Sequence, residues 1–311
     1  MKLNNIAFVG AGRTMEEHLK VISSIKNYKI QLSGIFSRTP SRAEKLKQKY
    51  KIQYNCKNLK DLYQKTKADI LVIVISAENV KKISIEAAKY PWKIFIEKPF
   101  GYNYEETKFL KKKLGSKIDN FNIALNRVHY GSTIGLLNEL KKDHSKRIIN
   151  IFDQESFYEN KKLSKYLMYT NSVHLFTYCS LLARGKLKKI EKVLHIKEKN
   201  KQHIIKKLIY DSGDIIIFHS LWNIPGPWKI DVSTKNNYYS LRPLEKLYIK
   251  KNNSNLFVEQ KTSEYDVKFK PGFKIQFINF LENVKKNKKK FNFDFYFEII
   301  TIIKKYYREY R

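Results

Sequence analysis

The first 125 residues alternate short apolar segments with segments whose apolar residues recur every three or four positions. The short apolar segments predict strands, which cover residues 6–9, a stretch ending at residue 36, and residues 70–75, 94–96 and 122–125. The segments between them predict helices, which cover residues 15–25, 41–50, 78–89 and 104–114. Because strand and helix alternate at this spacing, we expect an α/β domain with a parallel sheet covered by helices on both faces.

One of these helices has a start signal of its own. Ser41 and Glu44 lie three residues apart at its beginning. At this spacing a serine hydroxyl and a glutamate carboxylate can each accept a hydrogen bond from the other's backbone amide, which is the capping-box arrangement. We therefore expect Ser41 to cap this helix.

The pattern changes near residue 126. Apolar and polar residues now alternate along the chain, which predicts strands over residues 148–157, 188–197, 203–210, 214–222, 228–233 and 238–241. Helices are expected over residues 133–140, 166–182, 274–285 and 293–310. We therefore predict two domains, a doubly wound nucleotide-binding domain over residues 1–125 and an α+β domain with a large, mostly antiparallel open sheet over residues 126–311.

The composition allows two packed domains and does not indicate a membrane protein. Hydrophobic residues make up 42% of the 311 residues, which is enough for two cores of ordinary size. No apolar run approaches the roughly 18 residues that a membrane-spanning helix needs. The N-terminal Met1-Lys2-Leu3-Asn4-Asn5 leads into a strand and lacks the apolar stretch of a signal peptide. We expect a cytoplasmic protein without membrane insertion.

The formal net charge of +33 requires an explanation. A large basic excess is typical of proteins that bind nucleic acid, anionic membranes or anionic substrates. Here the lysines are spread along the whole chain, and no helix-turn-helix, zinc-finger or RNA-recognition pattern accompanies them. We interpret most of them as a solvated surface, with a minority available to attract a phosphorylated substrate, and we expect no nucleic-acid partner.

Cysteine and histidine do not indicate a metal centre or a disulfide framework. Cys56 and Cys179 are far apart in the sequence, and the seven histidines show no metal-binding spacing. We expect both cysteines to be structural and no metal to be bound.

A glycine-containing loop follows the first predicted strand and opens the first predicted helix. Its residues are Gly10-Ala11-Gly12-Arg13-Thr14. In a dinucleotide-binding Rossmann domain, the first glycine allows a tight turn and the second lets the backbone approach a pyrophosphate at the helix N-terminus. The third glycine of that motif is replaced by Met15. The order of strand, loop and helix nevertheless predicts cofactor binding by this loop.

The end of the second strand indicates which cofactor is bound. An acidic residue there would hold the ribose 2′-hydroxyl of NAD. This chain has Ser37-Arg38 instead, and an arginine can grip a 2′-phosphate with two hydrogen bonds. We therefore predict that NADP(H) is preferred and that NAD(H) remains possible, because Arg38 could instead stack on the adenine or lie in solvent.

The strand over residues 94–96 runs into Glu97-Lys98-Pro99. This places a lysine at the carboxyl edge of the sheet, where open α/β folds bind ligands. From the residues alone, a Glu-Lys pair at a strand end is more often an ordinary exposed ion pair.

Four motifs together resemble one family. They are Gly10-Ala11-Gly12 with His18 on the next helix, Ser37-Arg38-Thr39, Glu97-Lys98-Pro99, and Asn171-Ser172-Val173-His174. With this set the chain resembles the Gfo/Idh/MocA oxidoreductases, the relatives of glucose–fructose oxidoreductase and inositol dehydrogenase. The resemblance extends over nearly the whole chain, and Glu-Lys-Pro at this distance from the glycine loop is its most specific part.

The resemblance implies an enzyme and a set of site residues. Lys98 and His174 would attend the carbon that exchanges a hydride with nicotinamide, with the histidine transferring the hydroxyl proton and the lysine stabilising the developing alkoxide. Glu97 and Ser76 would lie at the cofactor, and Asn126 and Asn171 would bind the substrate. The implied reaction is the oxidation of a secondary alcohol, or the reduction of the corresponding ketone, on a sugar or nucleotide sugar.

Two departures from the family pattern leave an alternative open. Thr170 stands where many members carry an aspartate four residues before the histidine, and Met15 replaces a glycine. The alternative is therefore an inactive NADP(H)-binding scaffold or sensor of the same fold.

Two further segments refine the resemblance. Gly226-Pro227-Trp228 and residues 241–247 resemble members associated with bacterial surface-polysaccharide gene sets. The large sheet of the second domain also serves oligomerisation in this family. The resemblance therefore implies a role in polysaccharide biosynthesis and a homodimer or homotetramer that assembles through this sheet.

Overall fold

The computed structural model describes residues 4–157 and 166–308, and the chain divides into two compact units. Unit 1 comprises Met1–Asn126 together with Phe273–Tyr296, and unit 2 comprises Arg127–Gly272 together with Phe297–Arg311. The predicted boundary between residues 125 and 126 stays a prediction. The first three residues and the end of the last predicted helix lie outside the described residues.

Unit 1 contains a six-stranded parallel sheet in the order β3-β2-β1-β4-β5-β6. Its strands are β1 (Asn4–Val9), β2 (Ile30–Phe36), β3 (Tyr54–Cys56), β4 (Ile70–Ile73), β5 (Lys93–Glu97) and β6 (Phe121–Ala124). All four residues of β4 are buried because helices cover both faces of the sheet, as the continuous apolar run predicts. The reversal of strand order beside β1 confirms the doubly wound fold.

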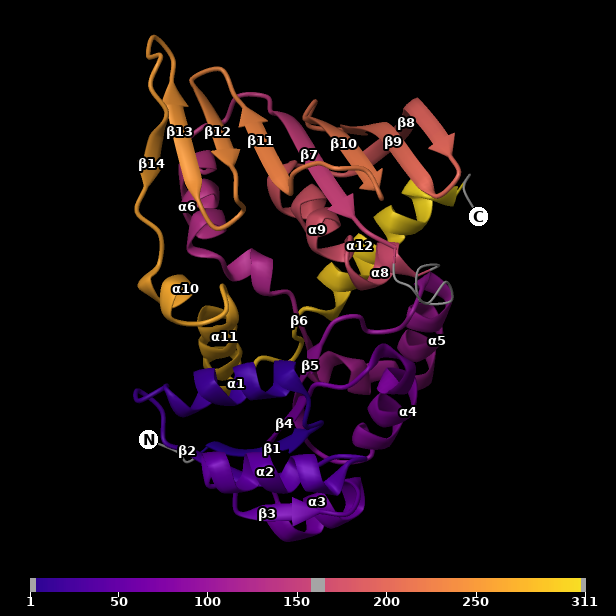
Figure 1. Cartoon of the computed structure of the whole chain (residues 1–311), viewed down its shortest axis with the longest axis vertical. Helices are drawn as coiled ribbons and strands as arrows, with labels where there is room; N and C mark the ends of the chain where they lie inside the picture. The colour runs from indigo at the N-terminus through magenta and orange to yellow at the C-terminus, as the bar shows by residue number, and fades with distance from the viewer. Residues whose placement is uncertain (1–3, 158–165, 309–311) are drawn as a thin grey trace. The chain divides into compact units, whose positions relative to one another are not determined.

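Five helices connect these strands (Figure 1). They are α1 (Arg13–Ser23), α2 (Pro40–Tyr50), α3 (Leu59–Thr66), α4 (Ala77–Ala87) and α5 (Tyr104–Leu114), with a 3₁₀ turn η1 (Gly115–Asn120) before β6. The expected capping box was wrong, because α2 begins one residue earlier, at Pro40. Proline is suited to the first helical position, since its φ is already helical and its missing amide is not needed there. Ser41 therefore lies inside the helix.

A segment from the end of the chain completes unit 1. Helix α11 (Phe273–Lys285) packs against α1, and Figure 1 shows it beside that helix. Farther along, the side chain of Asn292 pairs with the backbone of Ile123 on edge strand β6, accepting from its N–H at 2.7 Å and donating to its carbonyl at 2.7 Å. The local sequence pattern predicted the helix but did not indicate that it packs on the first domain.

Unit 2 contains an eight-stranded sheet in the order β14-β13-β12-β11-β7-β10-β9-β8. Its strands are β7 (Ile148–Glu155), β8 (Leu187–Glu198), β9 (Lys201–Tyr210), β10 (Ile215–Trp222), β11 (Lys229–Ser233), β12 (Asn237–Leu241), β13 (Leu247–Lys251) and β14 (Val258–Gln260). Neighbouring strands are antiparallel except for β7 and β10, which are parallel. The predicted large, mostly antiparallel sheet is confirmed, and β13 and β14 extend it beyond the prediction.

Helices cover one face of this sheet, as Figure 1 shows for α6 and α9. The helices that belong to unit 2 wholly or in part are η2 (Asn126–His129), α6 (Gly131–Leu140), α8 (Leu167–Thr170), α9 (Val173–Leu182), α10 (Glu264–Lys268) and α12 (Phe293–Tyr306). The single helix expected over residues 166–182 is split at Asn171-Ser172. Thr170, Asn171 and Ser172 follow one another there, and such side chains compete with helical hydrogen bonding. No helix within the described ranges is long and apolar enough to cross a membrane.

Candidate functional site

The predicted site residues of unit 1 follow the ends of neighbouring parallel strands. Gly10 follows β1, Ser76 lies three residues beyond β4, Lys98 follows β5, and Asn126 lies two residues beyond β6. Because these strands are parallel and adjacent in the order β1-β4-β5-β6, all four residues lie at the carboxyl edge of the sheet. This is the edge at which doubly wound sheets bind ligands.

The two loop glycines have different structural reasons to lack a side chain. Gly10 has a φ of +109°, and a methyl group there would collide with the carbonyl oxygen of Val74 on the neighbouring chain segment. Gly12 has an ordinary φ of −90°, and a methyl group there would meet nothing within 4 Å. The turn therefore requires glycine at position 10. At position 12 the protein itself leaves an open approach to the backbone.

The N-terminus of α1 faces this opening with free backbone amides. Gly12 is the N-cap, and no side chain caps the helix. The first-turn carboxylate of Glu16 would oppose an anion there, but it forms an ion pair with Lys49 at 2.6 Å. This hydrogen bond holds the pKa of Glu16 below its usual range. The helix end can therefore accept a phosphate group.

A cavity of about 640 Å³ opens at this loop. Seven of the predicted cofactor residues line it, namely Gly10, Gly12, Arg13, Thr14, Ser37, Arg38 and Ser76. Four cationic side chains are in the lining, namely Arg13, Arg38, Arg42 and Lys82. The single carboxylate in the lining is that of Glu86, so the lining carries a net positive charge. The volume is within the range of small-molecule sites, and the charge suits a ligand with several phosphates.

Short hydrogen bonds order the polar part of the lining. The hydroxyl oxygen of Ser37 accepts from the backbone N–H of Thr39 at 3.2 Å, which shapes the turn that carries Arg38. The side chain of Asn79 donates to the hydroxyl oxygen of Ser76 at 2.7 Å. Arg38, just after β2, and Arg42, in the first turns of α2, are exposed side chains that line the cavity. Unit 1 therefore contains a cavity that is suited to a dinucleotide.

Glu97 contacts helix α1, and its place at the cofactor stays a prediction. Its carboxylate oxygen lies 2.7 Å from Nε2 of His18 on α1, and neither Glu97 nor Lys98 is among the residues that line the cavity. His18 is fully buried and stacks on Phe273 of α11, with ring centroids 4.4 Å apart. Glu97 therefore fixes the end of β5 to α1, directly before Lys98. The peptide bond between Lys98 and Pro99 is cis.

Unit 2 brings Asn171 next to a carboxylate that was not predicted. The side chain of Asn171 donates to Oε2 of Glu155, at the end of β7, at 3.2 Å. His174 lies in the first turn of α9 and is 8% exposed. The hydroxyl of Thr170 donates to the carbonyl oxygen of Leu167 at 3.4 Å, within its own helix.

A second carboxyl group lies two residues before Glu155. Asp153 is completely buried. Burial, followed by the negative charge of Glu155, raises the pKa of Asp153 to about 7, and the hydroxyl of Ser172 and the charge of Arg127 act in the opposite direction. The structure thus places two acidic side chains beside the segment of residues 171–174. Lys98 belongs to unit 1 and His174 to unit 2, and their meeting at one nicotinamide stays a prediction.

Sequence reasoning missed several of these residues. Arg42, Asn79 and Lys82 lie on helices, one to two turns after the loop residues that were predicted. Asp153 and Glu155 did carry a signal, because they continue the alternating row of Ile149 and Ile151 that faces the helices. Two acids in a row of buried positions indicate a special environment.

Comparison with known proteins finds one family model that matches the N-terminal part of the chain. Residues 4–119 match the model of the Gfo/Idh/MocA family, described as an oxidoreductase family with an NAD-binding Rossmann fold. No curated protein matches the chain in sequence.

Solved structures match almost the whole chain. UDP-N-acetylglucosamine 3-dehydrogenase from Acidithiobacillus ferrooxidans is 14% identical, with a TM-score of 0.77 over 98% of this chain and 97% of that one. A dehydrogenase from Chromobacterium violaceum is 12% identical, with a TM-score of 0.82 over 98% and 94%. A levoglucosan dehydrogenase, solved with NADH and L-sorbose, is 12% identical, with a TM-score of 0.77 over 97% and 95%.

At these identities the structural matches establish the fold. The family match adds the NAD-binding domain and the reaction class. Over residues 4–119, the chain matches the Gfo/Idh/MocA family of NAD-binding oxidoreductases.

Proposed function

We propose that this oxidoreductase transfers a hydride between NADP(H) and a secondary alcohol or ketone carbon of a sugar or nucleotide sugar. The observation that carries the proposal is the cavity at the glycine loop. Its volume of about 640 Å³ and its cationic lining suit a phosphorylated dinucleotide. When bound, the nicotinamide supplies the hydride donor or acceptor.

Arg38 and Arg42 support the preference for NADP(H). Both line the cavity, and Ser37 at the end of β2 offers a hydroxyl where an NAD-specific site has a carboxylate. Two guanidinium groups can hold a 2′-phosphate by charge-assisted hydrogen bonds. Gly12, Arg13 and Thr14 would hold the pyrophosphate at the N-terminus of α1, and Ser76 would contact the cofactor beyond β4.

Four residues would bind and protonate the substrate. We assign proton transfer to His174 and stabilisation of the alkoxide to Lys98. Asn126 and Asn171 would hydrogen-bond the substrate hydroxyls. Thr170 cannot act as the missing carboxylate, and in this chain Glu155, which accepts a hydrogen bond from Asn171, brings a carboxylate to residues 171–174.

The structural neighbours support the substrate class. One is a UDP-N-acetylglucosamine dehydrogenase, and another is a levoglucosan dehydrogenase solved with a sugar. A nucleotide sugar would also agree with the polysaccharide-associated segments of the sequence.

The open face of the unit 2 sheet supports homo-oligomerisation. Ile148 on β7 is 53% exposed, and Val193 and Ile196 on β8 are 58% and 45% exposed. Exposed apolar groups on one sheet face are typical of a surface that meets a partner. We propose that a second copy of the chain covers this face over β7 and β8, where these residues lie, and leaves the tips of the β11–β12 and β13–β14 hairpins open.

Replacing Lys98 with alanine tests the catalytic assignment. The variant should lose turnover by about a hundredfold or more on any substrate that the wild type converts, because one alkoxide-stabilising group is absent. Its affinity for NADPH, measured by nicotinamide fluorescence, should stay within about threefold, since Lys98 does not line the cavity. The exposed Lys112→Ala on α5 is the matched control, and full turnover in Lys98→Ala would rule out the mechanism.

The inactive scaffold or sensor is the second candidate. The observation that favours it is the hydroxyl of Thr170, which is bonded within its own helix instead of supplying a carboxylate. Tight NADPH binding by the wild type, without turnover on UDP-, GDP- and CMP-linked sugars, would support this candidate over the enzyme.

A further inference from the structure

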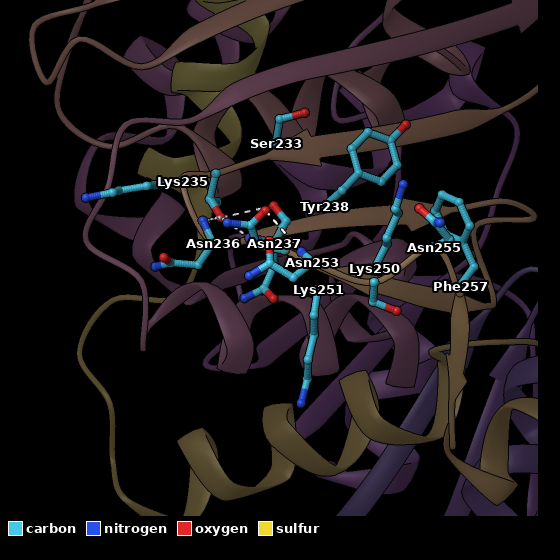
Figure 2. A pocket seen from close by; sticks show the side chains of 13 residues that line it. Ser233, Lys235, Asn236, Asn237, Tyr238, Lys250, Lys251, Asn253, Asn255 and Phe257 are labelled. Atoms are coloured by element: carbon cyan, nitrogen blue, oxygen red, sulfur yellow. Dashed lines mark hydrogen bonds between the residues drawn. The ribbon is translucent and has the colours of Figure 1, made fainter.

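A second cavity lies in unit 2, at the tips of two neighbouring hairpins. It has a volume of about 500 Å³ and is lined by residues 233–238, residues 250–255 and Phe257 (Figure 2). The β11–β12 turn and the β13–β14 loop form it, and the backbone N–H of Asn252 donates to the carbonyl oxygen of Asn236 at 2.9 Å. This bond ties the two tips together, so the cavity is a feature of the fold.

One row of side chains crosses three strands at the base of this cavity. Ser233 on β11 is paired in register with Tyr238 on β12, which is paired with Lys250 on β13. Side chains at paired positions lie on the same face of a sheet, so a hydroxyl, a phenol and an ammonium group stand side by side. Figure 2 shows Lys250 extending toward Tyr238 and Phe257.

Phe257 and Tyr238 form an aromatic corner around the ammonium group. Their rings are nearly perpendicular, with centroids 5.8 Å apart and an interplanar angle of 84°. The Nζ atom of Lys250 lies 5.9 Å from the centre of the Phe257 ring. Phe257 is 53% exposed, so one of its surfaces remains available to a ligand.

The charge of the cavity is uncompensated within the described residues. Lys235, Lys250 and Lys251 line it without a carboxylate partner, and no acidic residue is in the lining. The neighbouring carboxylates have their own partners: Asp231 pairs with Lys229 at 2.7 Å, and Glu259 pairs with Lys246 at 3.1 Å. A site with free cations and occupied anions attracts an anionic ligand.

The remaining lining suits a ligand with several hydroxyl groups. The side-chain amides of Asn253 and Asn255 make no hydrogen bond within the described part of the chain, and each offers a donor and an acceptor. Burial, followed by the negative charge of Asp231 and a hydrogen bond with it, raises the pKa of Tyr238 to about 12, so its phenol stays protonated at neutral pH and its oxygen can accept a hydrogen bond. Neighbouring hydroxyl groups on a sugar ring need this mixture of donors and acceptors.

We propose that this cavity binds a sugar ring that carries one carboxylate or phosphate group. The anionic group would meet the ammonium of Lys250, the ring would stack on Phe257, and the asparagine amides would bind the hydroxyls. This site lies in the β11–β14 part of the sheet and is separate from the glycine loop, so it stands independently of the proposed hydride transfer.

Calorimetric titration of the full-length protein with glucuronate and with glucose 6-phosphate tests the proposal. At least one of them should bind, and Lys250→Ala should weaken that binding about tenfold because a charge-assisted hydrogen bond is lost. Phe257→Ala should also weaken it, by about fivefold, through loss of the stacking surface. Lys261→Ala is the matched control, because Lys261 is an exposed lysine outside the cavity lining, and this variant should keep wild-type affinity.

The two charged sugars show whether the site recognises a carboxylate or a phosphate. Two further titrations, with inorganic phosphate and with uncharged glucose, show whether both the ring and the charge are needed. Binding of glucuronate alone assigns a sugar acid, and binding of glucose 6-phosphate alone assigns a sugar phosphate. Inorganic phosphate or uncharged glucose binding as tightly as the charged sugars would overturn the proposal. So would unchanged affinity in both Lys250→Ala and Phe257→Ala, or no binding of either charged sugar.

Discussion

Gly10 and Gly12 make the same local motif but should respond differently to substitution. Gly10→Ala forces a side chain into a φ of +109° and against the backbone of Val74, which should lower the free energy of unfolding by about 3 kcal/mol. Gly12→Ala meets no neighbouring atom and should change it by no more than about 1 kcal/mol.

The Gly12→Ala variant should also differ from the wild type in its affinity for NADPH. The methyl group of Gly12→Ala would occupy the open approach to the backbone, so NADPH affinity should fall at least about tenfold although the protein stays folded. Thermal unfolding and NADPH fluorescence titration measure the two effects. If Gly12→Ala bound NADPH as the wild type does, the pyrophosphate would not lie at this loop.

We expect Arg38 and Arg42 to determine the preference for NADPH over NADH. Each side chain lines the cavity, and loss of a charge-assisted hydrogen bond to phosphate costs about 1.5–3 kcal/mol. Arg38→Ala and Arg42→Ala should therefore weaken NADPH binding by about 10- to 100-fold and NADH binding by less than about threefold. Lys45→Ala, an exposed position on α2 outside the cavity lining, is the control. Equal weakening of both cofactors would contradict 2′-phosphate recognition.

At the residue scale, the sequence indicates which residues lie together where a chemical type and a backbone position coincide. The loop glycines, Ser37-Arg38 and Ser76 follow strand ends, and the structure brings them to one cavity. Arg42 and Lys82 could not be chosen in the same way, because many lysines and arginines lie on the helices of a chain with a net charge of +33. Only the winding of α2 and α4 distinguishes the cations that face the cavity from those that face solvent.

Strand β7 carries a buried carboxyl pair that should make its stability depend on pH. The pKa of Asp153 is raised to about 7 in the folded state, whereas an unfolded aspartate titrates near 4. Between roughly pH 4 and pH 7 the folded protein thus holds a proton that the unfolded chain has released. Stability from this group is therefore present below pH 4, falls as the pH rises through this window, and stays low above it.

Asp153→Asn removes this dependence. The free energy of unfolding of the variant minus that of the wild type should increase from pH 4 to pH 7 and then level off. Urea denaturation at a series of pH values measures this difference. The exposed Asp69→Asn controls for the loss of one carboxylate from the chain. A stability difference that decreases toward pH 7 would mean that Asp153 is ionised in the folded protein.

At the scale of elements, period and length predicted most helices and strands, and local details of termination were missed. Helix α5 begins and ends where the pattern placed it, with Gly115 after its last residue. The short strand β3 and helix α3 were not predicted, because three strand residues are too few to show a period. The parallel pairing of β7 with β10 is a non-local property, since alternation along a strand does not specify the direction of its neighbour.

At the scale of the whole molecule, the return of α11 to unit 1 is the feature that local patterns could not indicate. Phe277 and Phe280 of α11 contact Phe95 on β5, with ring centroids 5.3 and 5.4 Å apart. Phe273 stacks on His18, whose Nε2 bonds the residue before Lys98. A segment distant in sequence thus supports the strand end that carries the proposed catalytic lysine.

The first 126 residues alone should therefore not fold as a stable domain. The fragment leaves uncovered the surface that Phe273, Phe277 and Phe280 bury, and each such side chain contributes about 1.5–3 kcal/mol, against a typical domain stability of about 5–15 kcal/mol. Joining residues 273–296 to the fragment through a flexible linker should restore a cooperative thermal transition, followed by circular dichroism. A joined fragment with Phe277→Ala and Phe280→Ala is the control. If the bare fragment unfolds cooperatively at the same temperature as the joined one, α11 does not stabilise unit 1.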